Sequence, residues 1–245
     1  MRTLITGASS GLGAGMAREL AARGHDLALV ARRTDRLEAL AVELTARPGA
    51  PVVHTAALDV TDDEAVARVV PAMRDELGGL DRVVVNAGIG GGRPVGSGRP
   101  GANLRTARTN FVAAIAQCEA AMEIFREQGS GHLVVVTSVA ADRGLRGATT
   151  VYAATKAGLH TFVEGLRADV VGRGIAVTEL APGFIRTDLN EGMRMPFAVD
   201  AATGTRAMVA AMERRPAHAY VPRWPWSVLG PALRVMPMPL VRRLT

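Results

Sequence analysis

The chain has 245 residues, of which 48% are hydrophobic and 21% charged, as is typical of a globular protein long enough to bury a sizeable core. The formal net charge is +6, but the arginines are scattered without a long basic run, so we expect no nucleic-acid partner. A single cysteine, Cys118, excludes an intrachain disulfide and is compatible with a reducing, cytoplasmic location.

Short apolar runs alternate with longer helical patterns along the chain. The apolar runs predict strands at residues 2–6, 26–31, 51–58, 81–86, 132–138, 175–180 and 218–222. The helical patterns cover residues 11–23, 35–46, 62–77, 102–127, 152–172 and about 199–213. Several strand segments are solidly apolar, as in strands buried on both faces. The alternation therefore predicts an α/β fold: a single-domain, Rossmann-like, doubly wound parallel sheet of about seven strands with helices on both faces.

The two ends of the chain shape the expected domain organisation. The N-terminal residues carry no apolar leader and lead directly into the first strand, so we expect no signal peptide. The weakly charged run 224–241 contains four prolines and Arg234, which argues against a membrane span.

We predict a dinucleotide-binding and catalytic domain over 1–222, with the extension 223–245 packed on it. The extension is expected to cover a pocket or a subunit interface, with peripheral contact to an anionic membrane as the alternative.

The stretch TGASSGLG follows the first predicted strand and opens the first predicted helix. Glycines at such a place allow a tight turn and close approach to a pyrophosphate, and the helix N-terminus offers free N–H groups. A glycine-rich turn alone would also fit a plain helix entry, but the strand–turn–helix context favours dinucleotide binding. The predicted cofactor-binding residues of this loop are Gly7, Ser9, Ser10, Gly11, Leu12 and Gly13.

The second predicted strand ends in LVARR, without the carboxylate that would bind an adenosine ribose and exclude a 2′-phosphate. Arg32 and Arg33 stand there instead, and arginine suits phosphate geometry, so NADP(H) is preferred over NAD(H). The alternative is a pair of surface arginines, one of them paired with Asp35. After the third strand, Asp59 and Val60 follow; Asp59 is expected either to accept a hydrogen bond from an adenine amino group or to cap the next helix.

Tyr152 and Lys156, the only lysine of the chain, are four residues apart and share one face of a predicted helix. A nearby ammonium lowers the pKa of a phenol, which can then exchange a proton with an alcohol or a developing alkoxide. Ser138 ends a strand, where ligands of doubly wound sheets bind. The structural alternatives are an ordinary surface pair for Tyr152 and Lys156 and a turn cap for Ser138.

Other strand ends place further residues at the same edge of the sheet. The fourth strand ends in VVVNAG, and the sixth strand is followed by LAPGFIRTD. The predicted cofactor-binding residues from these two segments are Asn86, Ala87, Gly88, Pro182, Gly183, Ile185 and Thr187.

Together, TGASSGLG, NAG, Ser138 with YAATK and APGFIRT resemble the short-chain dehydrogenase/reductase family, in its single-domain branch, over about residues 2–222. The resemblance implies that Ser138 orients a carbonyl, Tyr152 is the acid/base, and Lys156 acts on the tyrosine and the nicotinamide ribose. It also implies that Asn110 anchors a water linked to Lys156 and that Thr187 contacts the carboxamide. A homodimer or homotetramer built on helices near 102–127 and 152–172 is implied as well. Ser10 departs from the pattern, since many NADP-dependent relatives have a basic residue there.

These observations predict an NADP(H)-dependent oxidoreductase that moves hydride between nicotinamide and a ketone or secondary alcohol, without a metal. A non-catalytic NADP(H)-sensing module and a 3-ketoacyl thioester reductase are the alternatives. Met193, Met195 and Phe197 predict an apolar lining of the substrate pocket, with packing against the domain itself as the alternative. The loop arginines Arg93, Arg99 and Arg105 are expected to be solvated, with an anionic substrate as the alternative.

Overall fold

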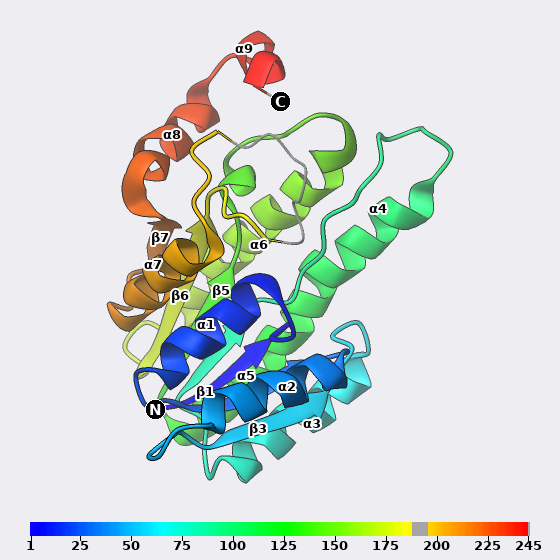
Figure 1. Cartoon of the computed structure of the whole chain (residues 1–245). Helices are drawn as coiled ribbons and strands as arrows, with labels where there is room; N and C mark the ends of the chain where they lie inside the picture. The colour runs from blue at the N-terminus through cyan, green and yellow to red at the C-terminus, as the bar shows by residue number, and fades with distance from the viewer. Residues whose placement is uncertain (188–195, 245) are drawn as a thin grey trace.

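A seven-stranded parallel sheet forms the centre of the computed structural model, which describes residues 1–187 and 196–244 (Figure 1). The strand order is β3-β2-β1-β4-β5-β6-β7. The strands are β1 (Arg2–Thr6), β2 (Asp26–Ala31), β3 (Val53–Ala57), β4 (Arg82–Val85), β5 (Gly131–Val136), β6 (Ile175–Pro182) and β7 (His218–Val221). The order reverses between β1 and β4, which makes the carboxyl ends of these strands a binding crevice. The predicted fold class is confirmed.

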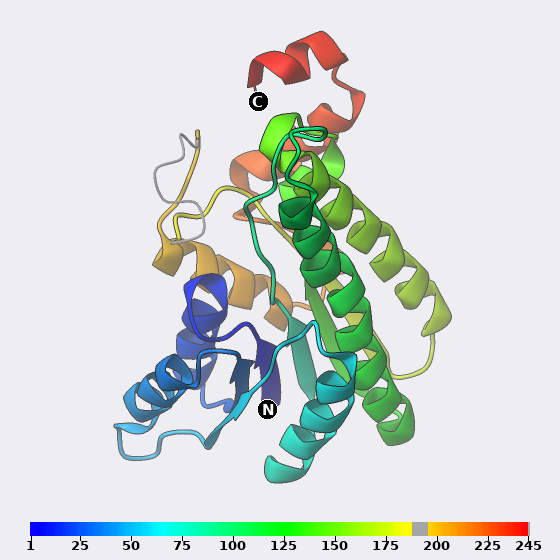
Figure 2. The same cartoon turned by 90° about the vertical axis from the view of Figure 1, so that its right-hand side faces the viewer.

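Helices cover both faces of the sheet (Figures 1 and 2). One face packs against α1 (Gly11–Ala21), α2 (Thr34–Thr45) and α7 (Ala201–Glu213). The other packs against α3 (Asp63–Glu76), α5 (Ala113–Gln128) and α6 (Thr150–Asp169), with α4 (Pro100–Ala107) leading into α5.

Adjacent residues of one strand point into the two different cores. Leu4 and Val83 belong to the core with α3, α5 and α6, whereas Ile5 and Val84 belong to the core with α1, α2 and α7. Because Thr3–Thr6 of β1 and all of β4 are buried on both faces, the sequence shows apolar runs and not an alternation.

The helix predicted over 102–127 differs from the observed structure in its middle. A π-helical segment, Arg108–Val112, separates α4 from α5. Such segments occur often at functional sites, and here the segment contains Asn110, one of the predicted site residues.

The extension forms two helices, α8 (Arg223–Val235) and α9 (Met238–Leu244), and it is attached to the body of the protein. Trp226 is buried and meets Phe184 edge to face at 5.1 Å between ring centroids. The Arg234 guanidinium pairs with the Asp142 carboxylate at 2.7 Å. Within the described ranges, no helix is both long and apolar enough to cross a membrane.

Candidate active site

A cavity of about 520 Å³ opens at the carboxyl edge of the sheet. It is lined by all the predicted catalytic and cofactor-binding residues except Gly13 and Asn110. Segments far apart in the sequence therefore meet where the strand ends predicted them to. The lining residues that the sequence analysis missed are Ala31, Leu58, Ile89, Thr109, Val136 and Thr137. Most of these directly adjoin a predicted residue, so the position of the strand ends was a usable signal for them.

The glycine loop after β1 is closely packed against the end of β4. Gly7 has φ +67°, and a Cβ placed there would lie 2.9 Å from the Cα of Ala87. A Cβ on Gly13 would lie 2.8 Å from Nδ2 of Asn86, so Gly13 shapes the loop although it does not line the cavity. Asn86 Nδ2 also donates to the carbonyl oxygen of Thr6 at 2.9 Å. Only glycine fits at Gly7 and Gly13, because any side chain there would collide with the residues that follow β4. A turn without side chains lets the backbone approach a pyrophosphate closely.

Arg33 reaches from the end of β2 to the glycine loop. Its guanidinium donates to Ser10 Oγ at 2.6 Å and to Ser9 Oγ at 3.1 Å. Arg32 pairs instead with Asp59 at 3.9 Å and remains largely exposed. Neither arginine pairs with Asp35 among the described residues, so that pairing is wrong, whereas both arginines do lie at the surface and the preference for NADP(H) stays a prediction. Both guanidinium groups line the cavity beside the loop that would hold a pyrophosphate.

Asp59 does not cap helix α3. Its carboxylate accepts hydrogen bonds from the backbone N and Oγ1 of Thr61 at 3.0 and 2.8 Å, which lower its pKa. The cap is Asp62, which accepts from the backbone N of Ala65 at 2.9 Å. The capping alternative for Asp59 is therefore wrong, and its role toward adenine remains a prediction.

Ser138, Tyr152 and Lys156 come together where β5 ends beside α6. Ser138 Oγ accepts from the backbone N of Ala140 at 3.1 Å and thereby caps a 3-10 turn, Val139–Asp142. The same hydroxyl acts on Tyr152, whose pKa it lowers. The turn-cap alternative is thus correct, and it does not exclude a further role for this hydroxyl beside Tyr152.

The pKa shifts of Tyr152 and Lys156 differ from the expectation that the lysine lowers the pKa of the tyrosine. Burial raises the pKa of Tyr152, and the hydrogen bond with Ser138 opposes that rise. Burial lowers the pKa of Lys156 to about 8, and its Nζ lies 5.9 Å from the centroid of the Tyr152 ring. Lowering of the Tyr152 pKa by Lys156 is therefore not the leading influence in this structure, and that role of the lysine remains a prediction.

Asn110 is buried in the π-helical segment and lies outside the cavity lining. Its Oδ1 accepts from the backbone N of Ile89, and its Nδ2 donates to the backbone O of Ile89, both at 2.8 Å. The side chain thereby fixes the backbone that follows Gly88, one of the lining residues. Its predicted role in anchoring a water remains a prediction.

Two further sets of predicted residues lie away from the cavity lining. Arg93, Arg99 and Arg105 are exposed and do not line it, in agreement with solvated side chains, although Arg105 lies in helix α4 and not in a loop. Phe197 is 62% exposed and does not line it, whereas Met193 and Met195 lie outside the described residues. The apolar substrate lining predicted from these three side chains thus lacks Phe197.

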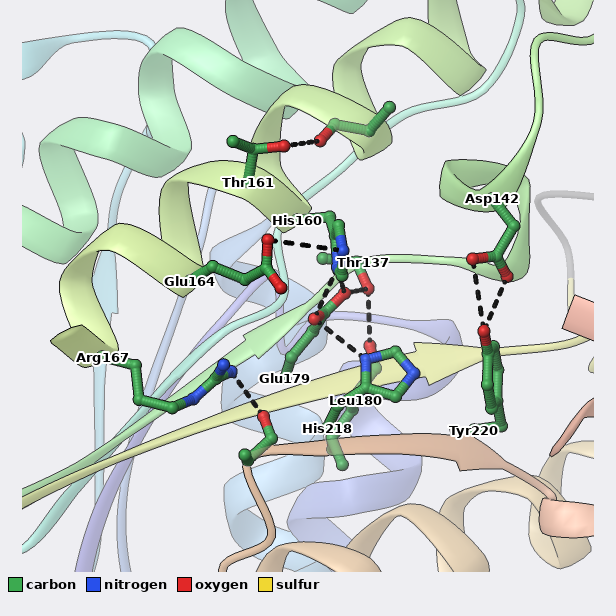
Figure 3. A network of polar contacts seen from close by, with 12 residues as sticks. Thr137, Asp142, His160, Thr161, Glu164, Arg167, Glu179, Leu180, His218 and Tyr220 are labelled. Atoms are coloured by element: carbon green, nitrogen blue, oxygen red, sulfur yellow. Dashed lines mark hydrogen bonds and ion pairs between the residues drawn. The ribbon is translucent and has the colours of Figure 1, made fainter. Parts of the chain in front are cut away.

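A buried carboxylate, Glu179 on β6, organises polar groups behind the site (Figure 3). Thr137 Oγ1 donates to it at 2.6 Å, and Nδ1 of His160 and of His218 lie 2.8 and 2.9 Å from Oε2. Burial acts to raise the pKa of Glu179, but hydrogen bonds from His218 and Thr137 and the histidine charges lower it to about 2. The ligand atoms of His160, Glu179 and His218 lie within 4.8 Å of one another, as in a metal cluster. Both histidine Nδ1 atoms already hydrogen-bond the Glu179 carboxylate, so the cluster is a hydrogen-bonded network.

This network adjoins Ser138 and Lys156 through the backbone. Thr137 precedes Ser138, and His160 lies one helical turn after Lys156 on α6. The sequence analysis missed it, although an acidic residue within the apolar strand β6 was a usable signal.

Comparisons with known proteins agree with this geometry. A family model described as short chain dehydrogenase matches residues 2–196. An uncharacterized oxidoreductase of Mycobacterium tuberculosis is 50% identical over 99% of this chain and 96% of its own. The structure of a short-chain dehydrogenase from Sphingobium yanoikuyae in complex with NADPH superposes with a TM-score of 0.83 at 29% identity, covering 94% of this chain and 92% of that one. An alcohol dehydrogenase of Thermococcus sibiricus complexed with 5-hydroxy-NADP gives a TM-score of 0.79 at 26% identity, covering 89% and 94%.

Proposed function

The chain belongs to the short-chain dehydrogenase family and is an oxidoreductase, and from this premise we propose that it transfers hydride between NADP(H) and a ketone or secondary alcohol. One observation carries the proposal: Ser138, Tyr152 and Lys156 line the same cavity as the glycine loop and Arg33. A proton donor, a carbonyl-orienting hydroxyl and a phosphate cradle thus lie in one cleft. A non-catalytic sensor would not need the first two.

The cleft fits a dinucleotide. At Gly7 and Gly13 a side chain would collide with neighbouring atoms. The loop therefore presents its backbone alone, as close approach to a pyrophosphate requires. The N-terminus of α1 begins at Gly11 and offers N–H groups and a favourable dipole to phosphate. When bound, NADPH would supply the hydride that reduces the carbonyl carbon.

The proton chemistry belongs to the chain itself. Ser138 would donate a hydrogen bond to the carbonyl oxygen and fix its direction. Tyr152 would donate its phenolic proton to that oxygen as negative charge develops, and would take the proton back in alcohol oxidation. Lys156 would hold the ribose hydroxyls and place positive charge beside Tyr152 whenever it is protonated.

Preference for NADP(H) is proposed from Arg32 and Arg33. Guanidinium groups bind phosphate in a planar, two-pronged geometry, and both lie at the end of β2, next to the glycine loop. Support comes also from the Sphingobium and Thermococcus structures, which contain NADPH and 5-hydroxy-NADP.

The test is NADPH oxidation with a panel of apolar ketones, with secondary alcohols and NADP⁺ in the reverse direction, and with 3-ketoacyl thioesters. We expect turnover of a ketone by the wild-type protein and none by Tyr152→Phe, with NADPH binding retained in the variant. Tight NADPH binding by the wild-type protein without turnover of any carbonyl would favour the sensor. Turnover confined to the thioesters would make the chain a 3-ketoacyl thioester reductase.

A further inference from the structure

The C-terminal part of the chain carries only one sign of charge. Residues 214–245 contain six arginines and no aspartate or glutamate. A segment of this kind is attracted to anionic partners.

The same part exposes apolar side chains. Val235, Met238 and Leu240 are 83%, 55% and 47% exposed, and the intervening prolines, Pro237 and Pro239, are exposed as well. Both views place α9 at one extreme end of the molecule, beyond the body formed by the sheet and its helices (Figures 1 and 2). These side chains are therefore presented outward, away from both hydrophobic cores.

The segment is held in place by the body of the protein. Arg143 Nη2 donates to the backbone O of Met236 at 3.0 Å, and Arg234 pairs with Asp142 at 2.7 Å. The Asp142 side chain is only 3% exposed, and its carboxylate also accepts from the hydroxyl of Tyr220 at 3.0 Å. Anchoring on both sides of Val235 fixes the direction in which the apolar residues point.

Arg146 and Arg242 flank a hollow of about 380 Å³ next to these apolar residues. Met238, Val241 and Gly144 complete its lining. Both arginines are exposed, and neither forms an ion pair within residues 1–187 and 196–244. A hollow with an apolar floor and two cations at its rim combines the features that bind an anionic headgroup and the start of its acyl chain.

We infer that this end of the molecule, the basic–apolar surface formed by Arg146, Val235, Met238, Leu240 and Arg242, docks on an anionic lipid bilayer. Apolar side chains enter the headgroup boundary while arginines contact the phosphates. A second copy of the chain is a poorer occupant, because a two-fold contact would place the same arginines against one another. The inference does not depend on the proposed reaction.

The experiment is co-sedimentation of the full-length protein with vesicles of phosphatidylcholine alone or of phosphatidylcholine mixed with phosphatidylglycerol. We expect partition onto the phosphatidylglycerol vesicles only, weakening as salt is raised. Arg146→Gln/Arg242→Gln should lower the partition coefficient about fivefold for each arginine removed. Met238→Ser/Leu240→Ser should lower it about tenfold.

Matched controls remove equal charge and comparable apolar surface near α2, which both views place toward the opposite end of the molecule from α9. Arg36→Gln/Arg47→Gln and Val42→Ser/Val52→Ser alter exposed residues there and should leave partition unchanged. Thermal melting of each variant verifies folding. Failure to bind phosphatidylglycerol vesicles, equal binding to both vesicle types, or equal losses in the controls would each overturn the inference. A wild-type dimer that Met238→Ser/Leu240→Ser dissociates, seen by light scattering without vesicle binding, would overturn it in favour of a second copy.

Discussion

Lys156 Nζ donates a hydrogen bond to the backbone oxygen of Val136, 2.8 Å away, and so ties helix α6 to the end of strand β5. The lysine side chain is buried, and burial lowers its pKa to about 8. Its ammonium therefore occupies a confined space between a strand end and the Tyr152 ring. This confinement gives a physical reason why one position keeps lysine in a chain whose other basic residues are arginines.

Lys156→Arg should reduce turnover by about two to four orders of magnitude, the range of a lost acid–base contribution. The planar guanidinium is larger than an ammonium and donates in fixed directions, so it cannot make the same contacts with Val136 and a ribose. Steady-state kinetics with NADPH and the best carbonyl of the panel measure the effect. Arg167→Lys, a change on the far end of α6 outside the cavity lining, is the control and should leave turnover unchanged. Near-normal turnover of Lys156→Arg would contradict this account.

Arg32→Ala/Arg33→Ala should abolish the preference for NADPH over NADH, lowering the ratio of their affinities about hundredfold. Removal of both guanidinium groups would delete the charge-assisted hydrogen bonds that we propose for the 2′-phosphate, which NADH lacks. The ratio is the proper readout because Arg33 also contacts Ser9 and Ser10, so its loss affects both cofactors.

Fluorescence titration of both cofactors gives this ratio directly. Arg36→Ala, an exposed arginine of α2 that does not line the cavity, is the control and should preserve the preference. Equal affinities of the wild-type protein for the two cofactors would remove the basis for an NADP(H) preference.

The strand ends made most of the cleft predictable from sequence. Parallel strands share one carboxyl edge, so residues such as Asn86 and Ser138, far apart in the chain, were bound to meet there. Side-chain direction was not predictable in the same way. Asn110 contacts the Ile89 backbone and does not line the cavity, and Asp62 rather than Asp59 caps α3. Which partner a side chain reaches depends on backbone positions that differ by only a few ångströms. The spacing of residues along the chain does not specify these positions.

Ser138→Ala should shift the pH dependence of alcohol oxidation to higher pH. In the proposed reaction, oxidation requires the phenolate form of Tyr152. Burial raises the pKa of that phenol, and the hydrogen bond with Ser138 partly offsets the rise. Loss of the hydroxyl removes this offset, so a higher pH is needed for the same fraction of phenolate. The pH–rate profile measures the shift. Ser138→Thr keeps a hydroxyl, so its oxidation rate should rise with pH over the same range as that of the wild-type protein. An unchanged pH–rate profile in Ser138→Ala would show that the hydrogen bond does not tune Tyr152.

The network around Glu179 shows what residue spacing could not predict. Its carboxylate binds groups from three other elements: Thr137 after β5, His160 on α6 and His218 on β7. Each contact depends on the strand register, in which Glu179 pairs with His218 and with Val135 across the sheet. The carboxylate thereby links the end of β5 and helix α6, which carry the candidate catalytic residues, to β7, the strand that precedes α8 and α9.

Glu179→Gln should destabilise the fold by about 3 kcal/mol at neutral pH, because a depressed carboxyl pKa is a stabilising contribution. The pKa of Glu179 is lowered from 4.5 to about 2, so its contribution is fully present above pH 4.5 and is lost as pH falls toward 2. The difference between wild type and variant, measured by urea unfolding, should therefore be large at pH 7 and shrink steadily below pH 4.5. Glu38→Gln, on the exposed side of α2, is the matched control and should show almost no difference at either pH. A difference between wild type and Glu179→Gln that does not change with pH would mean that the glutamate stabilises the fold by its shape and not by its charge.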